Sequence, residues 1–162
     1  MLVELKNLNK SYHNGVFDVP ALKNINLAIE KGEFTVFAGP SGSGKTTLLN
    51  IVGTMDKLTS GEAYVDKVEL TGLSRNEASD FRRDKIGFIF QSYNLIPVLT
   101  VYENVEFILD LTGKLRKAEK EKKIDTLLEE LGLIDFKYRK PSELSGGQQQ
   151  RVAIARALIK EP

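Results

Sequence analysis

A glycine-rich stretch, GPSGSGKTT at residues 39–47, carries residue types that suit phosphate chemistry. It fits the pattern G-x-x-x-x-G-K-[ST] at Gly39, Gly44, Lys45 and Thr46. Glycines let backbone N–H groups curl around an anion, and the positive end of a following helix faces that anion. Lys45 would bridge the β- and γ-phosphates, and the Thr46 hydroxyl would ligate Mg²⁺. The pattern predicts a site for a purine nucleoside triphosphate; a plain flexible loop is the alternative.

A second glycine-rich turn opens the last predicted helix, LSGGQQQRVAIARAL at residues 144–158. Ser145 stands where an N-cap hydroxyl belongs, and Gly146 and Gly147 expose backbone N–H groups at the positive end of the helix. The same physics therefore predicts a second anion site. A capped helix with a flexible lead-in is the alternative.

Two short apolar runs precede the polar residues of interest. Residues 34–38 (FTVFA) lead into the glycine-rich loop, and residues 86–90 (IGFIF) lead into Gln91. Both runs are rich in β-branched and aromatic residues, which predicts buried strands. Residues 25–29 alternate as a half-buried strand does, and residues 60–70 predict a hairpin that turns near Asp66 and Lys67.

Helices are predicted between these strands. Residues 46–52 follow the glycine-rich loop, and capping boxes at residues 74–77 and 100–103 mark two further helix starts. A charged stretch at 114–123 continues into a leucine-rich stripe that ends at Gly132. Strands interleaved with helices predict an α/β fold.

Composition narrows the function classes. The chain has 162 residues, of which 41% are hydrophobic, which suits one globular domain. A formal net charge of +1 gives no reason to expect nucleic-acid binding, and the absence of cysteine excludes disulfides and zinc–thiolate sites. No signal peptide and no apolar run near the ~20 residues of a membrane span is present. Any membrane connection is therefore expected to run through a partner.

The LSGGQ stretch, following the phosphate loop in this order, resembles the signature motif of the ATP-binding-cassette (ABC) ATPases. The resemblance extends from about Leu2 to Pro162. It implies an ABC-type P-loop NTPase with an antiparallel β part, a RecA-like core that is incomplete here, and a helical subdomain. The implied division of this single nucleotide-binding domain, incomplete at its C-terminal end, is 1–91 for the β part and P-loop core, 92–145 for the helical subdomain and 146–162 for the signature helix.

The resemblance also implies residue roles. Tyr12, in KSY, would stack on adenine, although a tyrosine at a strand end is otherwise core packing. Gln91 matches the Q-loop residue that reaches the metal or the attacking water, although it is otherwise a polar residue ending a strand. Gln91 and Lys45 are the implied catalytic residues, and Thr46 and Gln91 the implied Mg²⁺ ligands. The residues expected to contact ATP are Tyr12, Gly39, Pro40, Ser41, Gly42, Ser43, Gly44, Lys45, Thr46 and Thr47, with Ser145, Gly146, Gly147 and Gln148 contacting the ATP of a partner. His13 and the pair Arg82 and Arg83 are expected to be surface residues without a role.

The partners follow from the same resemblance. Two nucleotide-binding subunits would form a head-to-tail dimer around two ATP molecules. Residues 92–105 resemble the start of the family's helical subdomain, whose surface receives a coupling helix of a transmembrane permease subunit. The stretches 53–70 and 82–105 are most similar to ATPases of the lipoprotein-releasing and macrolide-export type. The implied location is cytoplasmic, on the inner face of the cell membrane through the permease, with no nucleic acid bound.

The family places an apolar strand ending in Asp, followed by Glu, after the signature helix, and no such segment occurs in these residues. We therefore expect the natural protein to continue past Pro162, and this chain alone to hydrolyse ATP very slowly or not at all. Two other classes stay open: a soluble ABC ATPase without transport, and a non-catalytic nucleotide-binding remnant. The sequence does not name a transported substrate.

Overall fold

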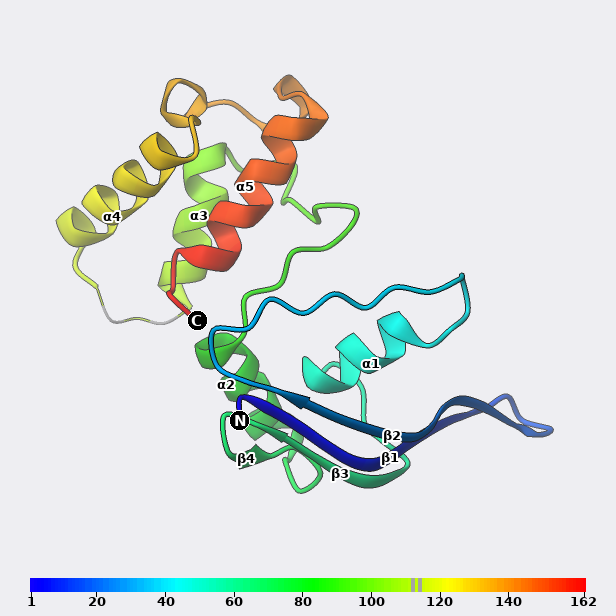
Figure 1. The fold of residues 1–162 in the computed structure, drawn as a ribbon. Coiled ribbons are helices and arrows are strands. Elements are labelled where there is room, and N and C mark those ends of the chain that lie inside the picture. Colours follow the sequence, from blue (N-terminus) through cyan, green and yellow to red (C-terminus); the bar gives the residue numbers. More distant parts are fainter. Residues whose placement is uncertain (112, 114) are drawn as a thin grey trace. The chain divides into compact units, whose positions relative to one another are not determined.

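The computed structural model describes residues 1–111, 113 and 115–162 (Figure 1). The chain separates into two compact units, Met1–Arg82 and Arg83–Pro162, and each is described by itself. The predicted functional division at residues 91 and 145 stays a prediction. No helix among the described residues is long and apolar enough to cross a membrane.

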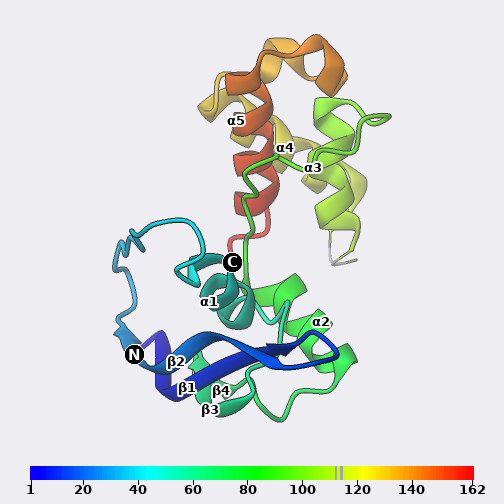
Figure 2. The same ribbon diagram turned by 90° about the vertical axis from the view of Figure 1, so that its right-hand side faces the viewer.

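The first unit is built on an antiparallel sheet in the order β2-β1-β3-β4 (Figures 1 and 2). Its strands are β1 (Val3–His13), β2 (Asp18–Ile29), β3 (Ser60–Val65) and β4 (Val68–Glu69). Apolar side chains alternate along β1, so that one face of the sheet is buried. The predicted hairpin turn is confirmed, because both residues between β3 and β4 adopt left-handed backbone angles, with φ of 48° and 66°.

Two helices complete this part of the chain. Helix α1 (Lys45–Val52) packs on β2 and β3 and covers one face of the sheet (Figure 2). Helix α2 (Arg75–Lys85) begins with the predicted capping box, in which Ser74 and Glu77 exchange two hydrogen bonds. The expectation of a solvated Arg82 was wrong, since its Nη1 donates to the Thr54 carbonyl at 2.7 Å. This bond links α2 to the segment that follows α1.

After the end of α2, the described residues of the second unit form three α-helices. These helices enclose one apolar core (Figure 1). These are α3 (Val101–Asp110), α4 (Lys117–Glu130) and α5 (Gly146–Leu158), with two short 3₁₀ turns at Ile134–Phe136 and Pro141–Glu143. The predicted capping box at Thr100 and Glu103 is confirmed. The buried core residues are Val101, Val105, Leu109, Ile124, Leu128, Leu133, Leu144, Val152, Ala155 and Ile159.

One polar side chain lies within this core. Asn104 is fully buried, and its carboxamide accepts a hydrogen bond from the Ile96 amide at 2.9 Å. The same group donates to the carbonyls of Ile96, Leu99 and Thr100 at 2.9–3.1 Å. One side chain therefore satisfies the backbone of the turn that leads into α3, as a buried polar group must.

The two predicted buried strands at 34–38 and 86–90 were wrong. Neither run joins the sheet, which among the described residues consists of β1 to β4 only. Phe34 is 92% exposed and Val36 is 70% exposed, and the chain between β2 and α1 runs as an irregular segment (Figure 1). A central strand of an α/β sheet needs a hydrogen-bonded strand on each side. Among the described residues, no strand pairs with 34–38 or with 86–90.

Candidate functional site

The glycine-rich loop ends where helix α1 begins, as the sequence predicts. Gly44 is the N-cap residue of α1 and has a left-handed backbone with φ of 87°. A Cβ at this position would lie 2.8 Å from the Ala21 carbonyl oxygen and 2.7 Å from the Leu22 side chain. Only glycine fits both the backbone angle and this close approach. The first turn of α1 therefore directs its backbone N–H groups toward the loop.

Lys45 folds back across this loop. Its Nζ donates to the carbonyls of Gly39 and Pro40 at 2.8 and 2.7 Å and to the Ser43 hydroxyl at 3.1 Å. The three donors of the ammonium group are thus matched by three loop oxygens. The loop holds one positive charge over the N-terminal end of a helix, which is an arrangement suited to a polyphosphate.

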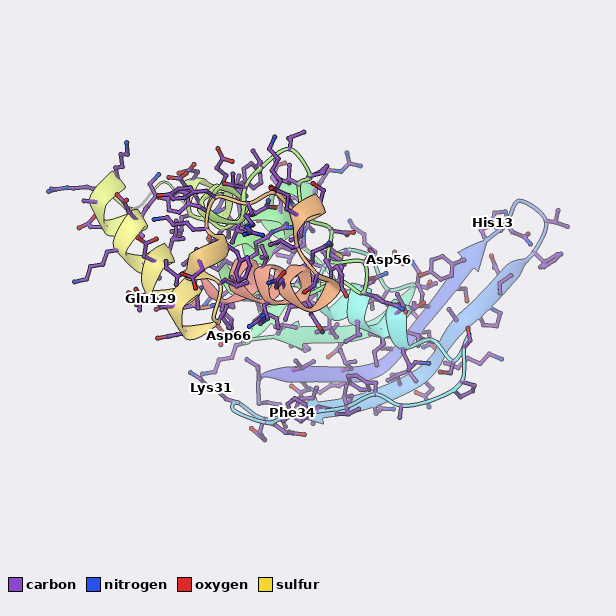
Figure 3. The ribbon with its side chains drawn as sticks, turned by 90° about the horizontal axis from the view of Figure 1, so that it is seen from above. His13, Lys31, Phe34, Asp56, Asp66 and Glu129 are labelled. Carbon is purple, nitrogen blue, oxygen red and sulfur yellow. The ribbon has the colours of Figure 1, made fainter. Side chains whose placement is uncertain are left out.

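Tyr12 lies near the end of β1, on the same unit as the loop. Its hydroxyl donates to Asp56 Oδ2 at 2.7 Å and lies 3.5 Å from Thr47 Oγ1. The ring is 42% exposed, and the Lys10 ammonium lies 4.6 Å from its centroid. The structure thus brings Tyr12 beside the first turn of α1. His13, at the outer end of β1, is exposed (Figure 3), and its Nδ1 lies 3.0 Å from Asp18 Oδ1.

Sequence reasoning missed Asp56 and Lys10. The Lys10 side chain is buried, and its Nζ donates to Asp56 Oδ1 and to the Lys57 carbonyl, both at 2.7 Å. Burial acts to raise the pKa of the Asp56 carboxyl, but hydrogen bonds from Lys10, Tyr12 and the Lys57 amide outweigh it and hold the pKa below its ordinary value. One signal was available, because Lys10 occupies an inward position of an otherwise apolar alternation with Leu8.

Gln91 is exposed and begins a tight turn in the second unit. After Ser92, Tyr93 and Asn94 have left-handed backbones with φ of 60° and 49°. The Arg156 guanidinium of α5 donates to the Asn94 carbonyl at 2.6 Å, and burial lowers the pKa of that guanidinium. The Tyr93 hydroxyl approaches Gly146, where a Cβ would lie 3.7 Å from it. The turn after Gln91 is therefore anchored to the helix that carries the second glycine-rich motif.

The second glycine-rich turn is a capped helix start. Ser145 Oγ accepts a hydrogen bond from the Gln148 amide at 3.3 Å, and Gln148 Oε1 accepts one from the Ser145 amide at 2.8 Å. A Cβ at Gly147 would meet no atom within 4 Å, so its surroundings are open. The predicted N-cap is confirmed, and the first amides of α5 face this open turn.

Replacing Ser145 with alanine should lower the free energy of unfolding by about 1 kcal/mol, because the Gln148 amide loses its acceptor. Urea unfolding followed by circular dichroism measures this loss. Ser142→Ala is the matched control, since Ser142 is exposed in the preceding 3₁₀ turn. Equal stability of the two variants would show that the cap contributes nothing.

Comparisons with known proteins identify the family to which a chain with these two glycine-rich loops belongs. Residues 22–162 match the family model described as ABC transporter. The chain belongs to the ABC transporter family. The ATP-binding cassettes of this family include proteins similar to this chain over nearly all of its length.

Among curated proteins, the chain is 49% identical to an uncharacterized ABC transporter ATP-binding protein, MJ0796 of Methanocaldococcus jannaschii, covering 99% of this chain and 70% of that protein. It is 48% identical to the macrolide export ATP-binding/permease protein MacB of Mannheimia succiniciproducens, covering 98% of this chain and 24% of that one. Among solved structures, a dimeric post-hydrolysis state of the MJ0796 cassette bound to ADP and Pi superimposes with a TM-score of 0.91 at 50% identity, covering 99% of this chain and 70% of that one. The predicted ABC-type α/β fold is confirmed.

The side chains at the loop fit the expected ligands of this family. The Lys45 ammonium places a positive charge at the loop, and the family binds ATP. Thr46 is exposed in the first turn of α1 and offers a hydroxyl oxygen, which is the donor type that Mg²⁺ takes. Among the residues that the structure describes, no group of three His, Asp or Glu could hold a metal. One or two protein oxygens are sufficient where phosphates and waters complete the shell.

Proposed function

We propose that the chain is the ATP-binding and ATP-hydrolysing part of a membrane transporter, of the export or lipoprotein-release type. The observation that carries this proposal is the glycine-rich loop with the Lys45 ammonium across it, at the N-terminal end of α1. Two similar proteins, an ABC transporter ATP-binding protein and a macrolide export protein, support the transporter assignment.

Each proposed site residue has its own task. Lys45 exchanges loop oxygens for β- and γ-phosphate oxygens, which keeps its charge satisfied in both states. Tyr12 would stack on the adenine ring, and Thr46 and Gln91 would each offer an oxygen to the metal. Bound Mg²⁺ would neutralise charge that develops on the transferring phosphoryl group. Gln91 also orients the attacking water.

The second glycine-rich turn serves a nucleotide held by another chain. Ser145, Gly146, Gly147 and Gln148 would contact the γ-phosphate of that ATP through the open first turn of α5. A head-to-tail dimer of cassettes around two ATP molecules uses both glycine-rich loops, and the dimeric structures of MJ0796 support it. The other proposed partners are permease subunits, which would hold the chain at the cytoplasmic face of the membrane.

This 162-residue chain should bind Mg-ATP yet release phosphate at a rate close to that of a buffer blank. Phosphoryl transfer depends on a positioned water and metal, and the Asp–Glu pair that supplies these in the family is not among these residues. Titration with a fluorescent ATP analogue measures binding, and a phosphate-release assay measures turnover. Absence of nucleotide binding would refute the proposed function. Normal turnover would refute only the expected inactivity.

A further inference from the structure

Two side chains beside Tyr12, those of Asp56 and Lys10, form a connected polar group with it, and the roles above leave both unused. The Asp56 carboxylate receives the Tyr12 hydroxyl on Oδ2 and the Lys10 ammonium on Oδ1, each at 2.7 Å. The Lys57 amide also donates to Oδ1, at 2.7 Å. Both carboxylate oxygens are therefore engaged, and the tyrosine hydroxyl has one fixed, charge-assisted acceptor.

Lys10 acts on the ring as well as on the carboxylate. Its Nζ lies 4.6 Å from the centroid of the Tyr12 ring, within the range of a cation–π contact. An aromatic ring has two faces, and the ammonium takes one of them. Tyr12 is 42% exposed, so part of its side chain is accessible to a planar ligand.

Asp56 is in turn fixed to the helix that starts at the phosphate loop. The amides of Met55 and Asp56 both donate to the Asn50 carbonyl in α1, at 2.7 and 3.1 Å. The Tyr12 hydroxyl also lies 3.5 Å from Thr47 in the first turn of α1. The first turn of this helix thus lies near the Tyr12 hydroxyl, and its later part holds the backbone of Asp56, to which that hydroxyl donates. The place of the ring relative to the loop is therefore set through α1.

We propose that Asp56, together with Lys10, is a positioning residue for nucleotide binding, which fixes the Tyr12 ring at the distance and orientation from the phosphate loop that an adenine base needs. This inference rests on the proposed function, because it concerns the same nucleotide. A side chain that served the fold alone would not need to hold the hydroxyl of a half-exposed ring. Sequence patterns give no indication of it, since Asp56 matches no motif.

The test compares two ligands that share the phosphate loop but differ in the base. ATP and inorganic tripolyphosphate are titrated calorimetrically into the whole chain and into Asp56→Asn and Asp56→Ala. Loss of a well-placed stacking ring should weaken ATP binding about tenfold in Asp56→Ala. The loss should be smaller in Asp56→Asn, which keeps an acceptor oxygen for the Tyr12 hydroxyl. Tripolyphosphate binding should stay within about twofold of the unchanged chain. Tyr12→Phe keeps the ring, and in its background Asp56→Asn should add little, because the hydroxyl through which Asp56 holds the ring is already gone.

Glu4→Gln is the matched control, since Glu4 pairs with Lys6 on the same strand and touches none of these groups. Unchanged ATP binding in both Asp56 variants overturns the inference. Equal loss of ATP and tripolyphosphate also overturns it, because Asp56 would then only stabilise the unit. If the unchanged chain binds tripolyphosphate but not ATP, the proposed stacking of adenine on Tyr12 is wrong, whereas phosphate binding by the glycine-rich loop is supported. If it binds neither ligand, the proposed function fails together with the inference.

Discussion

Replacing Lys45 with methionine should weaken ATP binding at least about thirtyfold. Hydrogen bonds that involve a charged group contribute roughly 1.5–3 kcal/mol each, and about 2 kcal/mol corresponds to a thirtyfold change in affinity. The Lys45 ammonium makes three such bonds to the loop, and the proposed function exchanges some of them for phosphate oxygens. Methionine keeps the length of the side chain and a good helix former at the start of α1.

Calorimetric titration of ATP and of tripolyphosphate into Lys45→Met measures this effect. Both ligands should lose affinity together, because the ammonium acts on phosphate, whereas the Asp56 variants should affect ATP alone. Lys31→Met is the control, since Lys31 is exposed in the turn after β2 (Figure 3). If Lys45→Met binds ATP as tightly as the unchanged chain, Lys45 does not bind phosphate, and the proposed function loses its main support.

Replacing Asn104 with leucine should destabilise the second unit by about 3 kcal/mol. The carboxamide makes four contacts with the backbone of residues 96–100, and a net hydrogen bond contributes about 1 kcal/mol. Leucine fills a similar volume but leaves these backbone groups without their partner in a place that excludes water. The turn before α3 then loses its support, although the apolar core around it is intact.

Urea unfolding of Asn104→Leu, followed by circular dichroism, gives the change in free energy. Asn76→Ala is the type-matched control, because Asn76 is exposed on α2 and should change stability by less than about 0.5 kcal/mol. A result within that range for Asn104→Leu would mean that the turn is satisfied by water or by its own backbone.

Local signals in the sequence predicted local structure well. The predicted capping boxes at Ser74 and Thr100 and the predicted N-cap at Ser145 all form, because each involves only a hydroxyl, a carboxylate or carboxamide and amides within four residues. The β3–β4 turn and the helix stop at Gly132, with φ of 62°, follow from backbone preferences of single residues. Nothing distant in the chain is needed for any of these features.

Features that depend on distant partners were predicted poorly. The runs at 34–38 and 86–90 have the composition of buried strands, but composition does not supply the neighbouring strands that would bury them. Asp56 joins Lys10 across 46 positions of sequence, and Arg82 joins Thr54 across 28. The inward position of Lys10 in β1 marks that residue alone, and no motif marks its partner, so the setting of Tyr12 emerged only from the structure.

The irregular segment at residues 34–38 has a consequence for how the chain behaves in concentrated solution. It contains no charge and no proline, three of its residues are aromatic or β-branched apolar types, and Phe34 and Val36 are largely exposed. The backbone of this segment belongs to no sheet of the described residues. The same segment of a second chain can therefore form β-sheet hydrogen bonds with it. Self-association of this chain is therefore expected to rise steeply with concentration and to begin at this segment, and a lysine at position 36 would suppress it.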